Sequence, residues 1–327
     1  MRYAKHLIVF AVIPLFMQAG SAWSQATADN FPTRPISMVV PYDPGGAVDL
    51  ECRMYSAKLG AALGQQVIIE YKPGGGTTVG IGYVAKSKPD GYAVVAVSTG
   101  LTVIPAFYKD LPFDVSKDLA PISLMSKQHS SIQVHPSFPA KTLTEYIAYA
   151  RANPGKINYG TAGPGSISHL AGAWMHALTG TKATFIPHKG TGPLLLELMA
   201  GRIDVGTGLL VATMPMIKAG KVRPLAVLGD QRAALLPDLP TAAEQGVTGY
   251  NYSSWIGFLA AGGTPAPIVN KLSEAFARVA KSPDIVAELE KQSSIPVGST
   301  PAQFRQWITT ELVRWRKVVD DAGLKLE

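Results

Sequence analysis

Residues 41–49 read PYDPGGAVD, and this stretch joins a short apolar run, ISMVV at 36–40, to a segment of helical spacing from Ala47 to Leu63. Two adjacent glycines between a predicted strand and a predicted helix are typical of an anion-binding loop, because the first N–H groups of a helix have no partner inside it. Asp49 falls in the first helical turn, where the helix dipole favours a carboxylate. The stretch therefore predicts a strand–loop–helix unit with a potential anion site in its loop.

The same strand–loop–helix order recurs along the chain. It continues with QVIIE at 66–70, a helix over 77–86 and YAVVAVS at 92–98. The later predicted elements are helices at 142–153, 166–179, 191–200 and 214–219, and strands at 156–160, 183–187, 202–208 and 222–228. Alternation of this kind indicates sheets covered by helices. We therefore expect an α/β fold with two separate blocks, each a mixed, mostly parallel sheet flanked by helices.

Turn-rich stretches indicate where the chain passes between the two blocks. We place these passages near 126–130 and 245–255, so that one lobe comprises residues 26–127 plus 250–327 and the other comprises residues 128–249. Two passages side by side would make a hinge. From Pro301 onward, apolar residues recur at spacings of three and four, which predicts a long amphipathic helix packed on one lobe.

Residues 1–25 have the features of a secretory signal peptide: Arg2 and Lys5 precede an apolar run of about 11 residues, and small residues follow. Crossing a bilayer takes roughly 20 apolar residues, so we predict cleavage near Ala22 or Ser24 and a periplasmic mature protein. Cleavage lowers the Lys and Arg count from 30 to 28, against 23 Asp and Glu, a formal charge of +5. This dispersed charge does not indicate nucleic-acid binding.

The motifs of common enzymes and metal sites are missing from the sequence. It contains no Walker A pattern, no H-E-x-x-H, no G-x-S-x-G and no Cys or His pair at metal-ligand spacing. Gly80, Gly82 and Ala85 match G-x-G-x-x-A, but inside a predicted helix, which argues against a dinucleotide site. The single cysteine, Cys52, fits either a thiolate near a helix start or a buried thiol. We therefore predict no enzyme activity, no cofactor and no metal.

Four glycine-rich loops each follow a predicted strand. They are DPGGAVD at 43–49, KPGGGTT at 72–78, GTAGPGS at 160–166 and KGTGP at 189–193. Glycine lets several N–H groups converge on a ligand, and ligands of open α/β sheets bind beyond the carboxyl ends of strands. Ser166 also fits a helix N-cap, His169 a half-buried helix residue, and any single loop a tight turn. Recurrence in both halves nevertheless predicts one shared site.

Longer segments of the chain resemble the Bug receptors, the periplasmic solute-binding proteins of tripartite tricarboxylate transporters. The similarity is carried, in order, by VVPYDPGGAVD, GQQVIIEYKPGGGTTVG, SKPDGYAVV, PGKINYGTAGPGSISHLAGAWM and IPHKGTGPLLLELMAGRIDV. The resemblance implies a two-lobed periplasmic-binding-protein clamshell that closes on a small organic carboxylate and delivers it to membrane permease subunits. It implies neither catalysis nor a cofactor, and we expect a monomer.

The resemblance also implies which residues bind the ligand. The first loop from Tyr42 to Asp49 and the third from Thr161 to His169 would hold one carboxylate through backbone amides and hydroxyls, and the remaining residues would line the rest of the site. The full predicted set is Tyr42, Asp43, Gly45, Gly46, Ala47, Val48, Asp49, Gly75, Gly76, Thr77, Ser98, Thr99, Thr161, Ala162, Gly163, Gly165, Ser166, His169 and Asp204.

Three positions depart from the family pattern. Val48 stands where the family usually has threonine, Ile104 where asparagine often precedes Pro105, and Thr77 where glycine is frequent. Fewer polar groups favour a less polar ligand body. We therefore expect an aromatic or longer-chain dicarboxylate such as terephthalate in preference to citrate, glutamate or aspartate. Val48 and Ile104 could equally be packing residues.

Two alternatives to a transport receptor remain open at the level of sequence. A ligand-sensing partner of a two-component kinase would use the same cleft, so the chain does not separate sensing from transport. An exported enzyme acting on a carboxylate, with Cys52 or His169 as its catalyst, is less favoured, because no nucleophile and base occur together in a recognisable motif.

Overall fold

The computed structural model describes residues 30–324 except 109, 164–165 and 322. The predicted signal peptide at 1–25 lies outside the described residues. Within the described ranges, no helix combines the length and the apolarity that crossing a bilayer requires.

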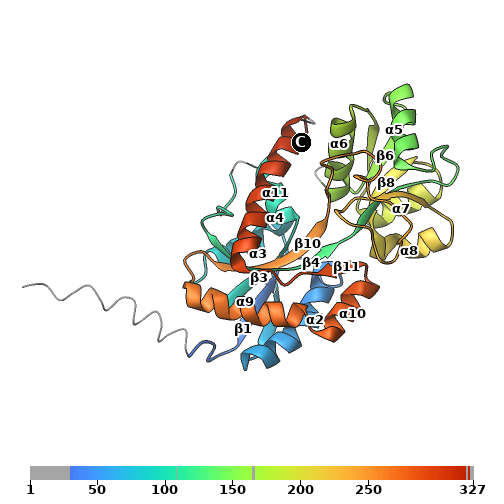
Figure 1. Cartoon of the computed structure of the whole chain (residues 1–327). Helices are drawn as coiled ribbons and strands as arrows, with labels where there is room; N and C mark the ends of the chain where they lie inside the picture. Colours follow the sequence, from blue (N-terminus) through green and yellow to red (C-terminus); the bar gives the residue numbers. More distant parts are fainter. Residues whose placement is uncertain (1–29, 109, 164–165, 322, 325–327) are drawn as a thin grey trace, which may run out of the picture.

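The first sheet has the strand order β11-β4-β10-β3-β1-β2. Its strands are β1 (Ile36–Val40), β2 (Val67–Tyr71), β3 (Ala93–Ser98), β4 (Leu119–Gln128), β10 (Ser254–Ala261) and β11 (Ser294–Pro296). Its helices are α2 (Ala47–Leu63), α3 (Thr78–Ala85), α4 (Gly100–Phe107), α9 (Ala266–Ala280), α10 (Pro283–Lys291) and α11 (Pro301–Asp321), with a short 3-10 turn, η1, at Gly75–Thr77. In β1, Met38 and Val40 pack on the side of α2 and α9, whereas Val39 packs on the side of α3, as the alternation of a strand requires. Together these elements form the first lobe (Figure 1).

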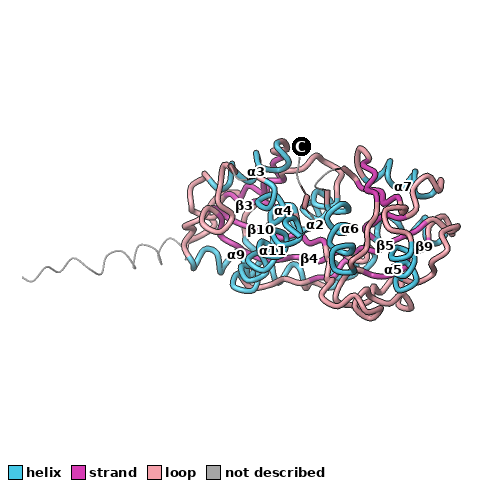
Figure 2. The backbone as a smooth tube through the Cα atoms, turned by 90° about the horizontal axis from the view of Figure 1, so that it is seen from above, coloured by secondary structure: helices cyan, strands magenta, loops and turns pink. Residues whose placement is uncertain are grey.

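The second sheet has the strand order β7-β6-β8-β5-β9. Its strands are β5 (Ser130–Val134), β6 (Asn158–Thr161), β7 (Thr184–Pro187), β8 (Val205–Leu209) and β9 (Arg223–Val227). Its helices are α5 (Leu143–Ala152), α6 (Ile167–Thr179), α7 (Thr191–Met199) and α8 (Leu210–Lys218). These elements form the second lobe, which lies beside the first along the long axis of the molecule (Figure 2).

The predicted fold class is confirmed, but the parallel share of each sheet is lower than predicted. Only two of the five neighbouring strand pairs in the first sheet and two of the four in the second are parallel. The antiparallel pairs involve β4, β5 and β10, which lead the chain into or out of a passage between the sheets without a crossover helix.

The chain passes from the first sheet to the second at His129, between β4 and β5, and returns between β9 and β10. The two passages are hydrogen-bonded to each other. The Leu228 N–H of the return passage donates to the carbonyl of Ser130, at the start of β5, at 2.9 Å. Within the return passage, the Tyr252 N–H donates to the Leu228 carbonyl at 2.7 Å. The lobes are therefore joined by adjacent extended segments.

Helix α11 contacts both lobes, which differs from the prediction that the C-terminal helix packs on one. Its first half buries Phe304 and Ile308 in the first lobe, and its second half buries Trp315 among residues of the second lobe. The Trp315 ring packs edge-on against Trp174 of α6 at a centroid distance of 5.8 Å. A helix of 21 residues spans about 30 Å, which is long enough to reach both lobes (Figure 1).

Candidate functional site

Three loops leave the first sheet at one edge. β1 lies between β2 and β3 and runs parallel to both, with Val40 opposite Tyr71 and Val39 opposite Val95. The carboxyl ends of these strands therefore meet at the same edge, and the loops that follow each of them start there. This edge carries the first loop, the second loop and Ser98, as predicted.

Helix α2 begins without a side-chain cap. Its N-cap residue is Gly46, and no side-chain hydrogen bond caps the helix start within the described part of the chain. Gly45, Gly46 and Ala47 are exposed. Because the first N–H groups of a helix lack intrahelical partners, this start can accept an anion.

Asp49 is buried and holds the first loop in place. Its Oδ2 accepts the Gly45 N–H at 2.8 Å, and its Oδ1 accepts the Tyr71 hydroxyl at 2.6 Å and the Arg53 Nε–H at 3.0 Å. Burial by itself raises the pKa of Asp49, but the hydrogen bonds from Tyr71, Gly45 and Arg53 outweigh it and hold that pKa below its usual value. Asp49 therefore positions the loop.

Two predicted residues of the first lobe turn their side chains into the protein. Val48 is 8% exposed and packs in the core beneath α2. Thr99 is fully buried, and its hydroxyl accepts the Trp255 N–H at 3.2 Å. The packing alternative therefore fits Val48, and the Thr99 side chain, expected at the strand end, also lies in the core. By contrast, the Tyr42 and Ser98 hydroxyls lie 2.8 Å apart at the loop edge.

The second loop has four successive residues with positive φ: Gly74 at 120°, Gly75 at 55°, Gly76 at 60° and Thr77 at 86°. Glycine adopts this conformation readily, whereas a β-branched residue rarely does. The Thr77 Oγ1 is also buried without a hydrogen-bond partner among the described residues. This backbone explains why glycine would be the ordinary choice at position 77 and why threonine is strained there.

In the second lobe, Ser166 caps α6 by accepting the His169 N–H at 3.3 Å, as the N-cap alternative requires. The His169 ring packs edge-on against Phe185 at 4.9 Å, and burial lowers the pKa of His169. The half-buried reading of His169 therefore fits the structure. Gly165, which belongs to the predicted set, lies outside the described residues.

Hydroxyl groups organise the backbone of this third loop. Ser168 Oγ accepts the Ala162 N–H at 2.9 Å, and Thr161 Oγ1 accepts the Gly163 N–H at 3.4 Å. The predicted amides of Ala162 and Gly163 are thus already paired. Ser168 was missed at the level of sequence; the hydroxyl two positions after the N-cap was the available signal. The Ser166 and Ser168 hydroxyls also lie 3.2 Å apart, so one of them donates its proton to the other. A hydroxyl that accepts hydrogen bonds still has its own proton to donate, so the other hydroxyl of this pair keeps its proton.

Asp204 lies away from this loop. Strands β6 and β8 are parallel, with Tyr159 opposite Val205, and the Asp204 Oδ2 accepts the Asn158 N–H at 2.8 Å. Asp204 therefore stands at the amino edge of the sheet, whereas the third loop leaves the carboxyl edge after Thr161. At a rise of about 3.3 Å per residue, the two edges are roughly 10 Å apart. This places Asp204 outside the predicted site. Its carboxylate instead accepts the N–H of Asn158, the first residue of β6.

The family model described as the tripartite tricarboxylate transporter family receptor, TctC, matches residues 52–324. The chain belongs to this family. This TctC-family chain is 36% identical over 316 residues to a UPF0065 protein of Bordetella pertussis, with 96% of each chain covered. The predicted resemblance is thereby confirmed.

Two solved structures are similar to this TctC-family receptor. One is an R. palustris protein solved with adipate, at 32% identity and a TM-score of 0.77, covering 90% of this chain and 99% of that one. The other is the periplasmic binding protein BugD, at 30% identity and a TM-score of 0.74, covering 91% and 100%. The fold is therefore that of periplasmic solute-binding receptors.

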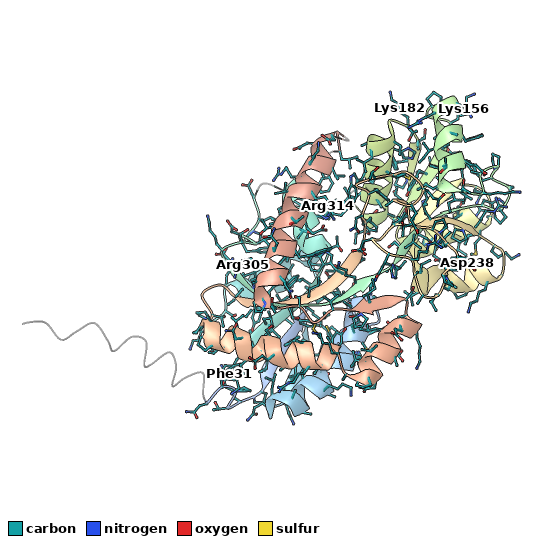
Figure 3. The ribbon with its side chains drawn as sticks, in the orientation of Figure 1. Phe31, Lys156, Lys182, Asp238, Arg305 and Arg314 are labelled. Atoms are coloured by element: carbon teal, nitrogen blue, oxygen red, sulfur yellow. The ribbon has the colours of Figure 1, made fainter. Side chains whose placement is uncertain are left out.

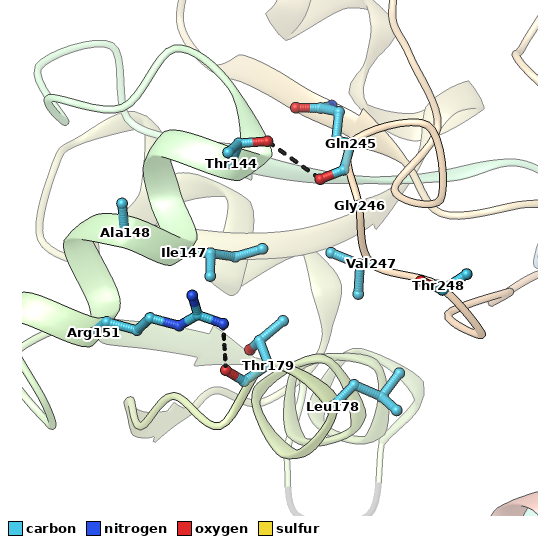
Figure 4. Close-up of a pocket in the computed structure, with 10 residues that line it drawn as sticks. All are labelled: Thr144, Ile147, Ala148, Arg151, Leu178, Thr179, Gln245, Gly246, Val247 and Thr248. Carbon is cyan, nitrogen blue, oxygen red and sulfur yellow. Dashed lines mark hydrogen bonds between the residues drawn. The ribbon is translucent and has the colours of Figure 1, made fainter.

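A pocket of about 340 Å³ on the second lobe of this TctC-family receptor is separate from the glycine loops (Figure 4). It lies between α5, the end of α6 and residues 245–248, and the Arg151 Nη2 donates across it to the Thr179 carbonyl at 3.2 Å. Ser166 and the third loop are at the opposite end of α6, about 20 Å away for a helix of 13 residues. The pocket therefore does not belong to the candidate site.

Within the described ranges, no group of three or more His, Cys, Asp or Glu residues could hold a metal ion. Cys52 is fully buried, and burial raises the pKa of its thiol well above the usual value. The buried-thiol alternative fits Cys52, because a reactive thiolate needs a lowered pKa and access.

Proposed function

We propose that this receptor captures a small dicarboxylate between its two lobes, as a periplasmic monomer freed of residues 1–25, and delivers it to permease subunits of a tripartite transporter. The observation that carries the proposal is the uncapped start of α2 beside Gly45 and Gly46. A helix start with free N–H groups favours a carboxylate through both hydrogen bonds and the dipole. The similar protein solved with adipate supports this ligand class.

The two lobes would hold the ligand with different groups. The first lobe offers backbone N–H groups at Gly46 and Ala47, whereas the second offers the hydroxyls of Thr161, Ser166 and Ser168. No arginine side chain is needed for this recognition, so shape and the spacing of the ligand's polar ends would decide specificity. The ligand shifts the lobes toward closure only by its contacts with the closed form.

We further propose a long or aromatic dicarboxylate, with terephthalate preferred to citrate. A 1,4-substituted benzene ring separates its two carboxylates by about the span of extended adipate, the ligand solved with the similar R. palustris protein. One departure from the family pattern still supports this preference: Ile104 on α4 is apolar where the family often has asparagine. Thr77 does not support it, because threonine adds a hydroxyl where glycine has none. Val48 no longer does, because it packs in the core.

A thermal-shift series tests the proposal on the chain without residues 1–25. The ligands are malate, adipate, terephthalate and citrate, with terephthalamide as the matched neutral control. A ligand that binds only the folded state adds about 2.7 kcal/mol at a hundredfold excess over Kd. We expect terephthalate and adipate to raise the melting temperature more than citrate. A rise with terephthalamide and none with any carboxylate would refute the anion site.

A further inference from the structure

The backbone of His129 forms hydrogen bonds to both lobes at the point where the chain passes between them. Its N–H donates to the carbonyl of Ser293 in the first lobe at 3.3 Å, and its carbonyl accepts the N–H of Leu210 in the second lobe at 2.9 Å. The His129 side chain is 5% exposed. A relative rotation of the lobes must therefore act on this residue.

The imidazole of His129 lies against the second passage of the chain. A Cβ built on Gly229 would lie 3.4 Å from His129 Nδ1 and 3.3 Å from Ser253 Oγ. Gly229 follows β9 and Ser253 directly precedes β10, so both belong to the return of the chain toward the first lobe. Because Gly229 has no side chain, two polar atoms can lie close to its backbone on this passage.

The Nδ1 of His129 is buried without a hydrogen-bond partner among the described residues. Burial lowers the pKa of His129, and nearby Asp230 opposes this only in part, so the surroundings favour the neutral ring. A neutral imidazole that carries its proton on Nε2 can accept a hydrogen bond at Nδ1. An unpartnered polar atom in the interior is unfavourable, so a conformation that supplies a partner would be stabilised.

The surroundings of the ring leave room for movement. A pocket of about 370 Å³ beside His129 is lined by residues between 231 and 237 in the second lobe and between 290 and 296 in the first. In its wall, the hydroxyls of Ser293 and Ser294 are also buried without partners among the described residues. Ser293 has a φ of 56°, which is rare for a residue other than glycine.

We propose that His129, Gly229 and Ser253 form the pivot of lobe closure, and that closure brings the Ser253 hydroxyl to His129 Nδ1. The inference rests on the proposed function only in that a ligand drives the closure. His129 is a positioning residue: it touches no ligand and sets the relative stability of the closed form, which the ligand then selects. Ligand affinity depends on that equilibrium, because only the closed population binds fully.

Gly229→Ala is the sharpest test, because the added methyl comes into close contact with both polar atoms. The backbone of Gly229 is not left-handed, so alanine introduces contact without backbone strain. Gly82→Ala is the matched control, since its added Cβ would meet Phe113 at an ordinary 3.6 Å, away from the passages. We expect about tenfold weaker binding of adipate and terephthalate for Gly229→Ala and no change for Gly82→Ala.

Interlobe distance is measured with spin labels on cysteines placed at Arg305 on α11 and Lys182 before β7, both exposed (Figure 3). The native Cys52 is fully buried and should not take a label. In the wild type, adipate or terephthalate should shorten the distance. In Gly229→Ala, the ligand-free distance should be longer and the ligand should shorten it less.

Substitutions of the two polar partners separate the hydrogen bond from the bulk of the ring. His129→Asn keeps a polar atom near the position of Nδ1 and should bind within about threefold of the wild type, whereas His129→Leu should bind about tenfold more weakly. Ser253→Ala should match His129→Leu, and the double variant should be no weaker than either, because both remove one interaction. None should lower the ligand-free melting temperature, which a merely structural role would.

Failure of the pivot and failure of the proposed function give different results. If no carboxylate binds the wild type, the proposed function is wrong. The interlobe spin-label distance of ligand-free Gly229→Ala then still tests whether these residues form the pivot. A longer distance supports the pivot. A distance and affinities equal to those of the wild type in both Gly229→Ala and His129→Leu overturn it.

Discussion

Helices α2 and α6 both follow glycine-rich loops, one in each lobe, yet their first turns are satisfied differently. α6 is capped by the Ser166 hydroxyl, whereas α2 starts at Gly46 with no side-chain cap within the described residues. Asp49, in the first turn of α2, places its carboxylate on the Gly45 N–H, preceding the helix. The start of α2 therefore has backbone N–H groups without a side-chain cap, which we propose bind the ligand, whereas the hydroxyls at the start of α6 already bond to the backbone and to each other.

The largest expected effect comes from removing the anchor of the first loop. Asp49→Ala leaves the Gly45 N–H and the Tyr71 hydroxyl without their acceptor, and we expect a loss of about 2–3 kcal/mol in the free energy of unfolding. Asp49→Asn keeps one acceptor for Gly45 and should lose less. Urea denaturation measures both. Equal losses would mean that the charge and not the Gly45 contact matters.

Removing the cap of α6 should have a smaller effect. Ser166→Ala leaves the His169 N–H without its side-chain acceptor, which should lower the free energy of unfolding by about 1 kcal/mol. Ser166→Gly should lower the free energy of unfolding by only a few tenths of a kcal/mol, because glycine is tolerated at the N-cap position. Thermal unfolding of both variants measures the difference. A loss of affinity larger than the loss of stability would show that the hydroxyl also contacts the ligand.

A serine at the N-cap of α2 should give this helix the side-chain cap that α6 already has. Gly46 has φ −79° and ψ 170°, which serine adopts without strain, so Gly46→Ser should cap the helix and stabilise the ligand-free protein by a few tenths of a kcal/mol. The new hydroxyl would also occupy the N–H groups proposed for the ligand. We expect weaker carboxylate binding in calorimetry despite the higher stability. Unchanged affinity would move the anion site away from α2.

The last prediction concerns how stability changes with pH. Asp49 and Glu51 lie two residues apart on α2, and their pKa values are shifted in opposite directions. Burial raises the pKa of Glu51, and hydrogen bonds from Ser126, Tyr55 and Gln128 offset this only in part. Its contribution to stability is therefore present below the unfolded pKa of about 4.3 and is lost as pH rises through the folded value. Asp49, whose pKa is lowered, contributes above its unfolded pKa and loses this as pH falls.

Glu51→Gln should consequently raise stability at pH 7 and lose that advantage in acid, whereas Asp49→Asn should lower stability at pH 7 and lose that penalty in acid. Urea denaturation from pH 3 to pH 7 checks both. Parallel pH profiles of the two variants would contradict the opposite shifts.

Much of the fold follows from local pattern. The helix predicted from Ala47 to Leu63 has those bounds in the structure, because Gly46 and Gly64 stand at its two caps. α8 was predicted to start at Met214 and starts at Leu210, because Leu210 is drawn into the core of the second lobe. Tertiary burial of this kind leaves no start signal in the chain.

The candidate site likewise has features that the sequence predicted and features that only the tertiary structure revealed. The glycine loops, the N-cap role of Ser166 and the family were readable from residue type and order, because backbone conformation and helix capping depend on neighbours in sequence. Only the tertiary structure decided that Val48 and Thr99 point into the core, that Asp204 stands at the wrong edge of its sheet, and that His129 meets Gly229. Those facts depend on which residues far apart in sequence lie together, and local physical chemistry does not determine that.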